Sequence, residues 1–124
     1  MIAINAQSKI LLAIEPIDFR KGIDSLAAVC RSALKQDPFC GAMFVFCNRS
    51  KTALKILSYD GQGYWLCMKR LSEGKFQWWP KSKQEMALKL TASQLLILLY
   101  NGNPDYAKIQ QDWRKIELED RPIH

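Results

Sequence analysis

The sequence is poor in the residues that carry most enzyme chemistry. Its 124 residues include one histidine, His124 at the very end, and its four cysteines (Cys30, Cys40, Cys47 and Cys67) form no C-x-x-C pair. Serine and cysteine nucleophiles need a base beside them, and structural zinc needs four nitrogen or sulfur ligands at close paired spacing. These absences argue against a triad hydrolase, and we predict neither a metal nor another cofactor.

Clustered carboxylates are missing as well. A nuclease or strand-transfer enzyme of the two-metal type needs several acidic side chains around its ions, whereas the available acids, Asp18, Asp60 and Glu73, are isolated. Asp60 belongs to a turn sequence and Asp18 suits a helix N-cap, so both have structural roles to fill. We therefore predict that the protein is not an enzyme.

Long hydrophobic runs are absent too. The longest, "LLILLY" at 95–100, is far too short to span a bilayer, and "MIAINAQSK" at the start has no basic and apolar signal-peptide pattern. The irregularly spaced cysteines are typical of reduced, mostly buried thiols. These features predict a cytoplasmic protein that does not contact a membrane.

Positive charge is abundant and unevenly distributed. The whole chain has a net charge of +6, and residues 41–91 alone carry nine basic against three acidic side chains. Such an excess attracts polyanions, of which nucleic acid is the commonest, although a solubilising surface is the simpler alternative. The predicted contacts to nucleic-acid phosphates are Arg49, Lys51, Lys69, Arg70, Lys75, Lys81 and Lys83.

The aromatic side chains between these cations allow two interpretations. They could stack on bases if exposed, but aromatic residues in strands more often pack in a core. The residues concerned are Tyr64, Trp65, Phe76, Trp78 and Trp79.

The pattern of apolar residues predicts an α+β fold. Continuous or strand-forming runs at 9–14, 42–48, 53–59, 64–69 and 75–79 predict a mostly antiparallel sheet of four to five strands. One amphipathic helix at 20–35 precedes the meander and one or two helices follow it, the first opened by a Thr91–Gln94 capping box. That helix is apolar almost all round, so this domain or another chain must cover it. We expect a single domain over residues 1–102 and a polar C-terminal extension, able to form a helix, over 103–124.

The stretch "YDGQGYWLCMKRL" at 59–71 holds two glycines that could suggest a phosphate-binding loop. It lacks the G-K-[ST] ending of a P-loop and is followed by a strand rather than a helix. Asp-Gly between two strand-forming runs is instead a strong hairpin signal. We predict a hairpin whose basic exit is Lys69 and Arg70.

Three segments in this order resemble a known family. They read "DFRKGIDSLAAV", "FVFCNRSKTALKILSYDGQGYWLCMKRLSEGKFQWWP" and "LTASQLLILLYNG", and the resemblance extends over roughly residues 9–102. The sequence closely resembles the TnpB-type (Orf2-like) accessory proteins of bacterial insertion-sequence-sixty-six elements. Cys47, residues 50–53 and the tail after Gly102 depart from the pattern. The remaining positions that match the family motif are Arg20, Lys21, Gly22, Asp24, Asp60, Gly61, Gly63, Gly74, Trp79 and Pro80.

The resemblance implies a non-catalytic accessory factor in the transposition of a bacterial mobile element. We expect DNA as a partner, held mostly by phosphate contacts, and the element's transposase or another element-encoded protein as a further partner. The alternative is a protein-interaction module that docks on the transposase without touching DNA. A homo-oligomer is compatible with either role.

Overall fold

The computed structural model of the chain describes residues 4–5, 7–81 and 84–105. These contain the strands β1 (Ile10–Ala13), β2 (Met43–Cys47), β3 (Ala53–Tyr59), β4 (Tyr64–Arg70) and β5 (Ala87–Leu90). Helix α1 (Ile23–Ser32) lies between β1 and β2, and α2 (Ala92–Leu99) follows β5. The α+β class, the mostly antiparallel sheet and the helices before and after the meander are thus confirmed.

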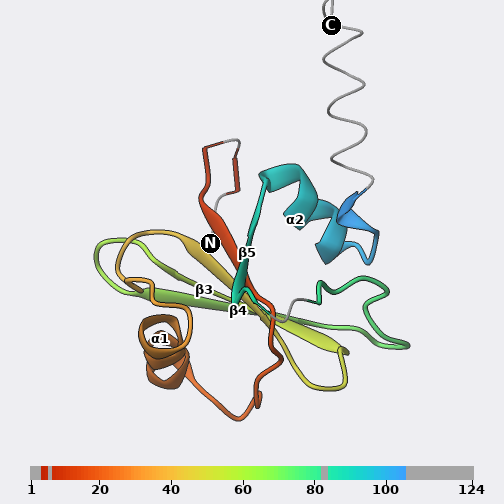
Figure 1. Cartoon of the computed structure of the whole chain (residues 1–124), viewed down its shortest axis with the longest axis horizontal. Coiled ribbons are helices and arrows are strands. Elements are labelled where there is room, and N and C mark those ends of the chain that lie inside the picture. The colour runs from red at the N-terminus through yellow and green to blue at the C-terminus, as the bar shows by residue number, and fades with distance from the viewer. Residues whose placement is uncertain (1–3, 6, 82–83, 106–124) are drawn as a thin grey trace, which may run out of the picture.

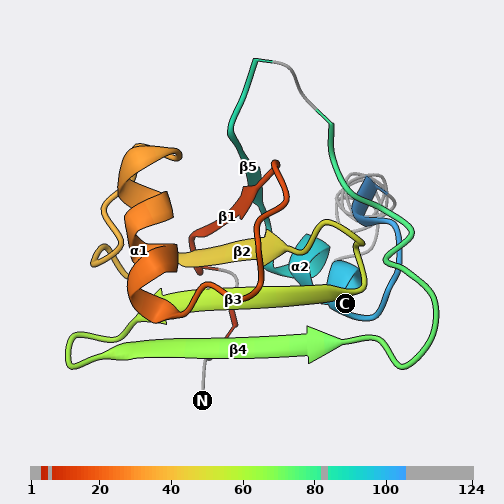
Figure 2. The same cartoon turned by 90° about the horizontal axis from the view of Figure 1, so that it is seen from below.

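The five strands form one sheet in the order β4-β3-β2-β1-β5. All neighbours are antiparallel except β1 and β2, which run parallel and are connected through α1. The sheet is therefore a β2–β3–β4 meander extended by β1 and β5 (Figure 2).

Both faces of the sheet are covered, by different helices (Figure 1). On one face Leu26 and Cys30 of α1 pack against Phe44 and Phe46 of β2. On the other face Leu95 and Leu98 of α2 belong to a second apolar cluster with residues of all five strands. Alternate residues of a strand point to opposite faces, which explains how the unbroken apolar run in β2 serves two cores.

Residues 75–79 do not form the predicted strand. Phe76 and Trp79 are buried in the α2-side core, and the indole N–H of Trp79 donates to the Ile14 carbonyl at 2.7 Å. The aromatic residues of this segment fill the core. Aromatic residues are also typical of strands, so the composition wrongly predicted a strand here. The fifth strand is instead β5, which is short and pairs with β1 through Leu88 and Leu90.

Helix α2 begins as predicted. The Thr91 side chain accepts from the Gln94 N–H, and the Gln94 side chain accepts from the Thr91 N–H, which completes the capping box. Only part of its apolar surface is covered within the described chain, since Leu95 and Leu98 are buried whereas Leu96 is exposed. The N-cap residue of α1 is Gly22, which provides no side-chain cap, so the N-cap role predicted for Asp18 is wrong.

The thiols follow the predicted pattern in part. All four cysteines are free, with Cys30 and Cys47 buried, Cys67 half-buried and Cys40 exposed. Burial raises the pKa of both Cys30 and Cys47 to about 12, so these two thiols stay protonated.

Candidate nucleic-acid interface

The hairpin predicted at 59–71 is confirmed as β3 and β4, with Tyr59 paired to Tyr64 across the turn. The Asp60 carboxylate accepts from the N–H groups of Gln62 and Gly63 at 2.9 and 3.0 Å. These bonds lower the pKa of Asp60. Gly61 has φ +98°, a conformation that favours glycine. The glycines therefore shape a turn and leave no phosphate loop.

The turn that connects β2 to β3 lies at the open end of the hairpin, opposite the Asp60–Gly61 turn. Asn48 organises this turn, because its Oδ1 accepts from the N–H groups of Thr52 and Ala53 and its Nδ2 donates to Thr52 Oγ1. Arg49 is exposed at the tip and Lys51 is half-exposed. An amide side chain thus fixes the backbone that presents both cations.

The end of β4 and the loop after it lie beside this turn. Arg70 is exposed and pairs with Ala53, the first residue of β3. The Phe76 N–H donates to the Lys51 carbonyl at 2.8 Å. This bond holds the neighbouring, exposed Lys75 at the same end of the sheet.

A third segment reaches the same place from the chain before α1. Ile17 forms a parallel bridge with Asn48, and Arg20 and Arg49 line one depression of about 780 Å³ together with Asp18. From the sequence, Arg20 was predicted only as a position that matches the family motif, and not as a phosphate contact. Only the fold brings it beside Arg49, and no local pattern in the sequence indicates that proximity.

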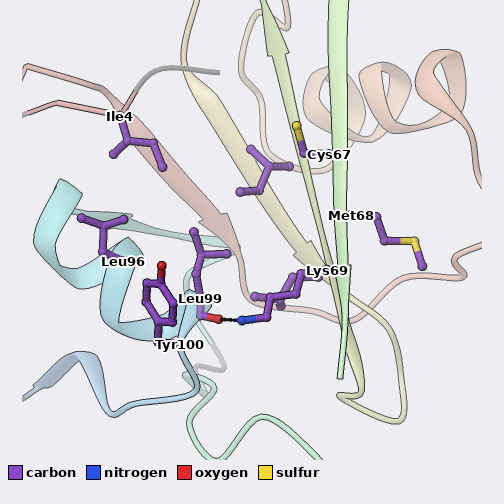
Figure 3. Close-up of a pocket in the computed structure, with 9 residues that line it drawn as sticks. Ile4, Cys67, Met68, Lys69, Leu96, Leu99 and Tyr100 are labelled. Carbon is purple, nitrogen blue, oxygen red and sulfur yellow. Dashed lines mark hydrogen bonds between the residues drawn. The ribbon is translucent and has the colours of Figure 1, made fainter. Parts of the chain in front are cut away.

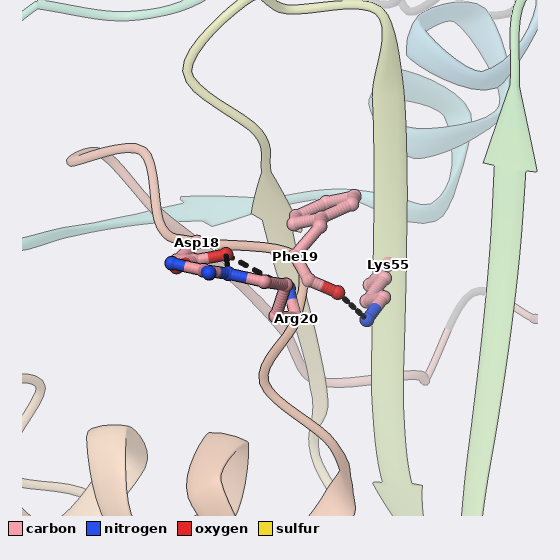
Figure 4. A network of polar contacts seen from close by, with 4 residues as sticks. All are labelled: Asp18, Phe19, Arg20 and Lys55. Atoms are coloured by element: carbon pink, nitrogen blue, oxygen red, sulfur yellow. Dashed lines mark hydrogen bonds and ion pairs between the residues drawn. The ribbon is translucent and has the colours of Figure 1, made fainter.

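Asp18 and Arg20 form a forked ion pair (Figure 4). Arg20 Nη2 lies 2.7 Å from Asp18 Oδ2, and the Arg20 backbone N–H donates to Oδ1 at 2.9 Å. These hydrogen bonds lower the pKa of Asp18 to about 2. The Asp18 carboxylate offsets the positive charge of Arg20 locally, and the Arg20 side chain remains exposed.

Lys55 ties this loop to the sheet. Its side chain is buried in the middle of β3, and Nζ donates to the carbonyls of Phe19 at 2.8 Å and Lys21 at 3.0 Å. Nζ also lies 4.9 Å from the centre of the Phe19 ring. A buried ammonium needs such partners, so Lys55 has a structural role that the sequence did not reveal.

Lys69 and Arg70 point to opposite faces of the sheet because they are neighbours in one strand. Lys69 faces α2, where its Nζ donates to the Leu99 carbonyl and lies 5.1 Å from the centre of the Tyr100 ring (Figure 3). The Lys69 ammonium therefore has an intramolecular partner at the carboxyl end of α2, whereas Arg70 is exposed.

Lys81 extends the positive surface toward β5. It lines a depression of about 420 Å³ with Lys51 and Pro80, and Glu15 and Glu85 border the same depression. Lys83, the seventh predicted contact, lies outside the described residues. We use the term basic end for the cations gathered here from four segments: Arg20, Arg49, Lys51, Arg70, Lys75 and Lys81.

The other positions that match the family motif lie at the start of α1, just before it, or in the loop after β4. Gly22 is the N-cap residue of α1, and Asp24 lies in its first turn. Gly74 has φ +73° in the loop after β4. Lys21 is exposed and lends its carbonyl to Lys55.

The aromatic residues divide between core and surface. Phe76 and Trp79 are buried, Tyr64 and Trp78 are half-buried, and Trp65 is 42% exposed. The indole N–H of Trp65 donates to Asp60 Oδ2 at 2.8 Å, so Trp65 lies at the turn, far from the basic end.

The described ranges contain neither a cluster of metal ligands nor a membrane-spanning helix. No three His, Cys, Asp or Glu side chains in residues 4–5, 7–81 and 84–105 lie close enough to share a metal ion. In the same part of the chain, no helix has the length and apolar character needed to cross a membrane.

A family model and two relatives match the chain. A family model described as IS66 Orf2 like protein matches residues 8–108. Two relatives come from Sinorhizobium fredii (strain NBRC 101917 / NGR234). The uncharacterized protein y4jC is 41% identical over 76 residues, which are 61% of this chain and 65% of y4jC. The uncharacterized protein y4hO is 36% identical over 110 residues, 89% of this chain and 92% of y4hO. The chain thus spans just under two thirds of the first relative's length, and no solved structure matches significantly.

Proposed function

Because the chain belongs to the IS66 Orf2-like family of transposition accessory proteins, we propose that it assists transposition by binding DNA phosphates through its basic end. The role is non-catalytic and cytoplasmic. The observation that supports it is the convergence of cations from four segments, which lie up to 61 residues apart in sequence (Arg20 to Lys81), on one end of the sheet. Phosphate contacts of this kind hold DNA without reading its sequence.

Arg49 and Arg70 are the best-placed contacts. Both are exposed at the end of the hairpin, and neither has a side-chain partner among the interactions of the described residues. Guanidinium groups bind phosphate with two parallel hydrogen bonds. Lys69 is a weaker candidate, because a phosphate contact would compete with its bond to the Leu99 carbonyl.

The first test is DNA binding by alanine variants, measured by fluorescence anisotropy with short duplexes of several sequences. We expect Arg49→Ala and Arg70→Ala each to weaken binding equally on all sequences and to lower the salt slope by about one. Lys69→Ala should have a smaller effect.

Lys9→Ala is the matched control. Lys9 is exposed and precedes β1 at the other end of the sheet, where its carbonyl accepts from Met43. It removes the same charge far from the basic end and should leave binding unchanged. If the wild-type protein binds neither duplex nor single-stranded DNA at low salt, the proposal is wrong. Co-purification with the transposase after nuclease treatment would then favour the docking alternative.

A further inference from the structure

Strand β4 is a long edge of the sheet. It has seven residues and no proline, and no strand of the described chain pairs with its outer side. The other edge, β5, has only four residues. Native proteins usually shorten, bend or cover such edges, because unpaired backbone groups invite another strand.

The hydrogen-bond pattern shows which backbone groups of β4 are unpaired. The Asp60 N–H donates to the Gly63 carbonyl and the Leu71 N–H donates to the Thr52 carbonyl, one at each end of the hairpin. In an antiparallel pair, hydrogen-bonded and non-hydrogen-bonded positions alternate. The N–H and C=O groups that point outward therefore belong to Tyr64, Leu66, Met68 and Arg70.

Apolar side chains flank this edge on both faces. Met68 is 56% exposed on the α1 side, and Trp65 is exposed on the α2 side. A groove of about 320 Å³ also opens on the α2 side, bordered by Cys67, Leu96 and Tyr100 (Figure 3). Exposed apolar side chains beside an unpaired strand are typical of a site that binds another strand.

We propose that the occupant of this edge is a second copy of the chain, whose β4 pairs antiparallel with β4 about a two-fold axis at Cys67. The axis is normal to the sheet, so both faces continue into a ten-stranded sheet with α1 helices on one side and α2 helices on the other. This register uses all seven residues, and the outward-pointing backbone groups of one copy meet those of the other. The pairs are Tyr64 with Arg70, Trp65 with Lys69, Leu66 with Met68, and Cys67 with itself.

Charge favours a second copy and this register. Neither cation of β4 meets a like charge, because Lys69 faces the Trp65 indole and Arg70 faces the Tyr64 ring, as in cation–π pairs. The Asp60 carboxylate bonded to that indole adds an opposite charge near Lys69. A register centred on Lys69 would oppose the two ammonium groups directly, which is destabilising.

The groove supplies the second argument. Trp65 of the second copy lies opposite Lys69, on the face where the groove opens. Its indole would cover the apolar wall formed by Leu96 and Tyr100, and Met68 would pack against Leu66 of the other copy. The exposed side chains of Trp65 and Met68 thus both gain packing partners in the proposed dimer.

Sedimentation velocity of the full chain across a concentration series tests the dimer. Met68→Lys places a cation in the apolar pair and should raise the dimer dissociation constant at least tenfold. Met86→Lys is the matched control, because Met86 is 45% exposed beside β5 at the other edge and the charge change is identical. A monomer at every concentration up to the solubility limit, or a Met68→Lys variant that dimerises as well as wild type, would overturn the proposal.

Disulfide trapping tests the register. In a Cys40→Ser background, which removes the exposed thiol, diamide should accept two electrons and two protons from a pair of Cys67 thiols and leave a covalent dimer. Non-hydrogen-bonded antiparallel partners lie within disulfide reach. The same chain with Cys67→Ser should stay uncrosslinked. Failure of the Cys40→Ser chain to crosslink while it dimerises would reject this register. Both experiments omit DNA, so their outcome is independent of the proposed DNA contact.

Discussion

At the scale of single residues, Asp18 and Arg20 show how a structural contact can also position a side chain in the proposed DNA-binding surface. The carboxylate holds the guanidinium at the surface, next to Arg49, while Lys55 anchors the backbone on either side of Arg20. Arg20 therefore belongs to the basic end only because two polar contacts fix a short loop.

The ion pair can be tested through the titration of Asp18. Arg20→Gln should raise the pKa of Asp18 from about 2 toward its ordinary value of 3.8, because the hydrogen bonds from Arg20 are the main cause of the low value. The folded-state pKa is the lower one, so the pair's contribution to stability is complete above pH about 4 and is lost as pH falls toward 2.

NMR titration of the side-chain carboxyls measures this shift. Asp60 is the internal control, because backbone N–H groups and the Trp65 indole lower its pKa and none of them involves Arg20. An unchanged Asp18 pKa in the Arg20→Gln variant would contradict the assignment.

At the scale of elements, local signals predicted the hairpin and the start of α2 within a residue or two. The Asp-Gly turn and the Thr91–Gln94 capping box are each set by a few neighbouring residues, so the rest of the chain has little influence on them. The strand predicted at 75–79 was wrong because its aromatic residues are buried in the core without pairing with another strand. β5 was missed because its pairing with β1 is the main reason it is extended.

The end of α2 gives a prediction at this scale. The Gly102 N–H donates to the Ile97 carbonyl, and a Cβ at Gly102 would lie 2.6 Å from Ile97 Cγ2 and 3.2 Å from the Ile97 carbonyl oxygen. Gly102→Ala should therefore lower the free energy of unfolding by about 1–3 kcal/mol, as overpacking does.

Urea denaturation measures the effect, with Gly63→Ala as the control. A Cβ at Gly63 would meet nothing within 4 Å, so that variant should stay within about 0.5 kcal/mol of wild type. Equal stability of the two variants would mean that the contact with Ile97 is unimportant.

At the scale of the whole molecule, the basic end predicts a definite salt dependence. Arg20 is paired with Asp18, which leaves five cations for phosphate. Five released counterions give a slope of log affinity against log salt of about −4.5 on duplex DNA, so affinity should fall about 500-fold between 50 and 200 mM salt. Anisotropy titrations at several salt concentrations measure the slope. A slope near zero would exclude phosphate contact as the source of binding.

The sequence by itself determined the family, the hairpin, the capping box and the excess of cations in residues 41–91, because motifs, turns, caps and composition are local properties of the chain. Only the tertiary structure decided that Lys69 faces α2 while Arg70 remains exposed, that Arg20 joins Arg49, and that β4 is left as an open edge. These depend on strand order and on the pairing of segments tens of residues apart, which packing against two helices selects and no short stretch encodes.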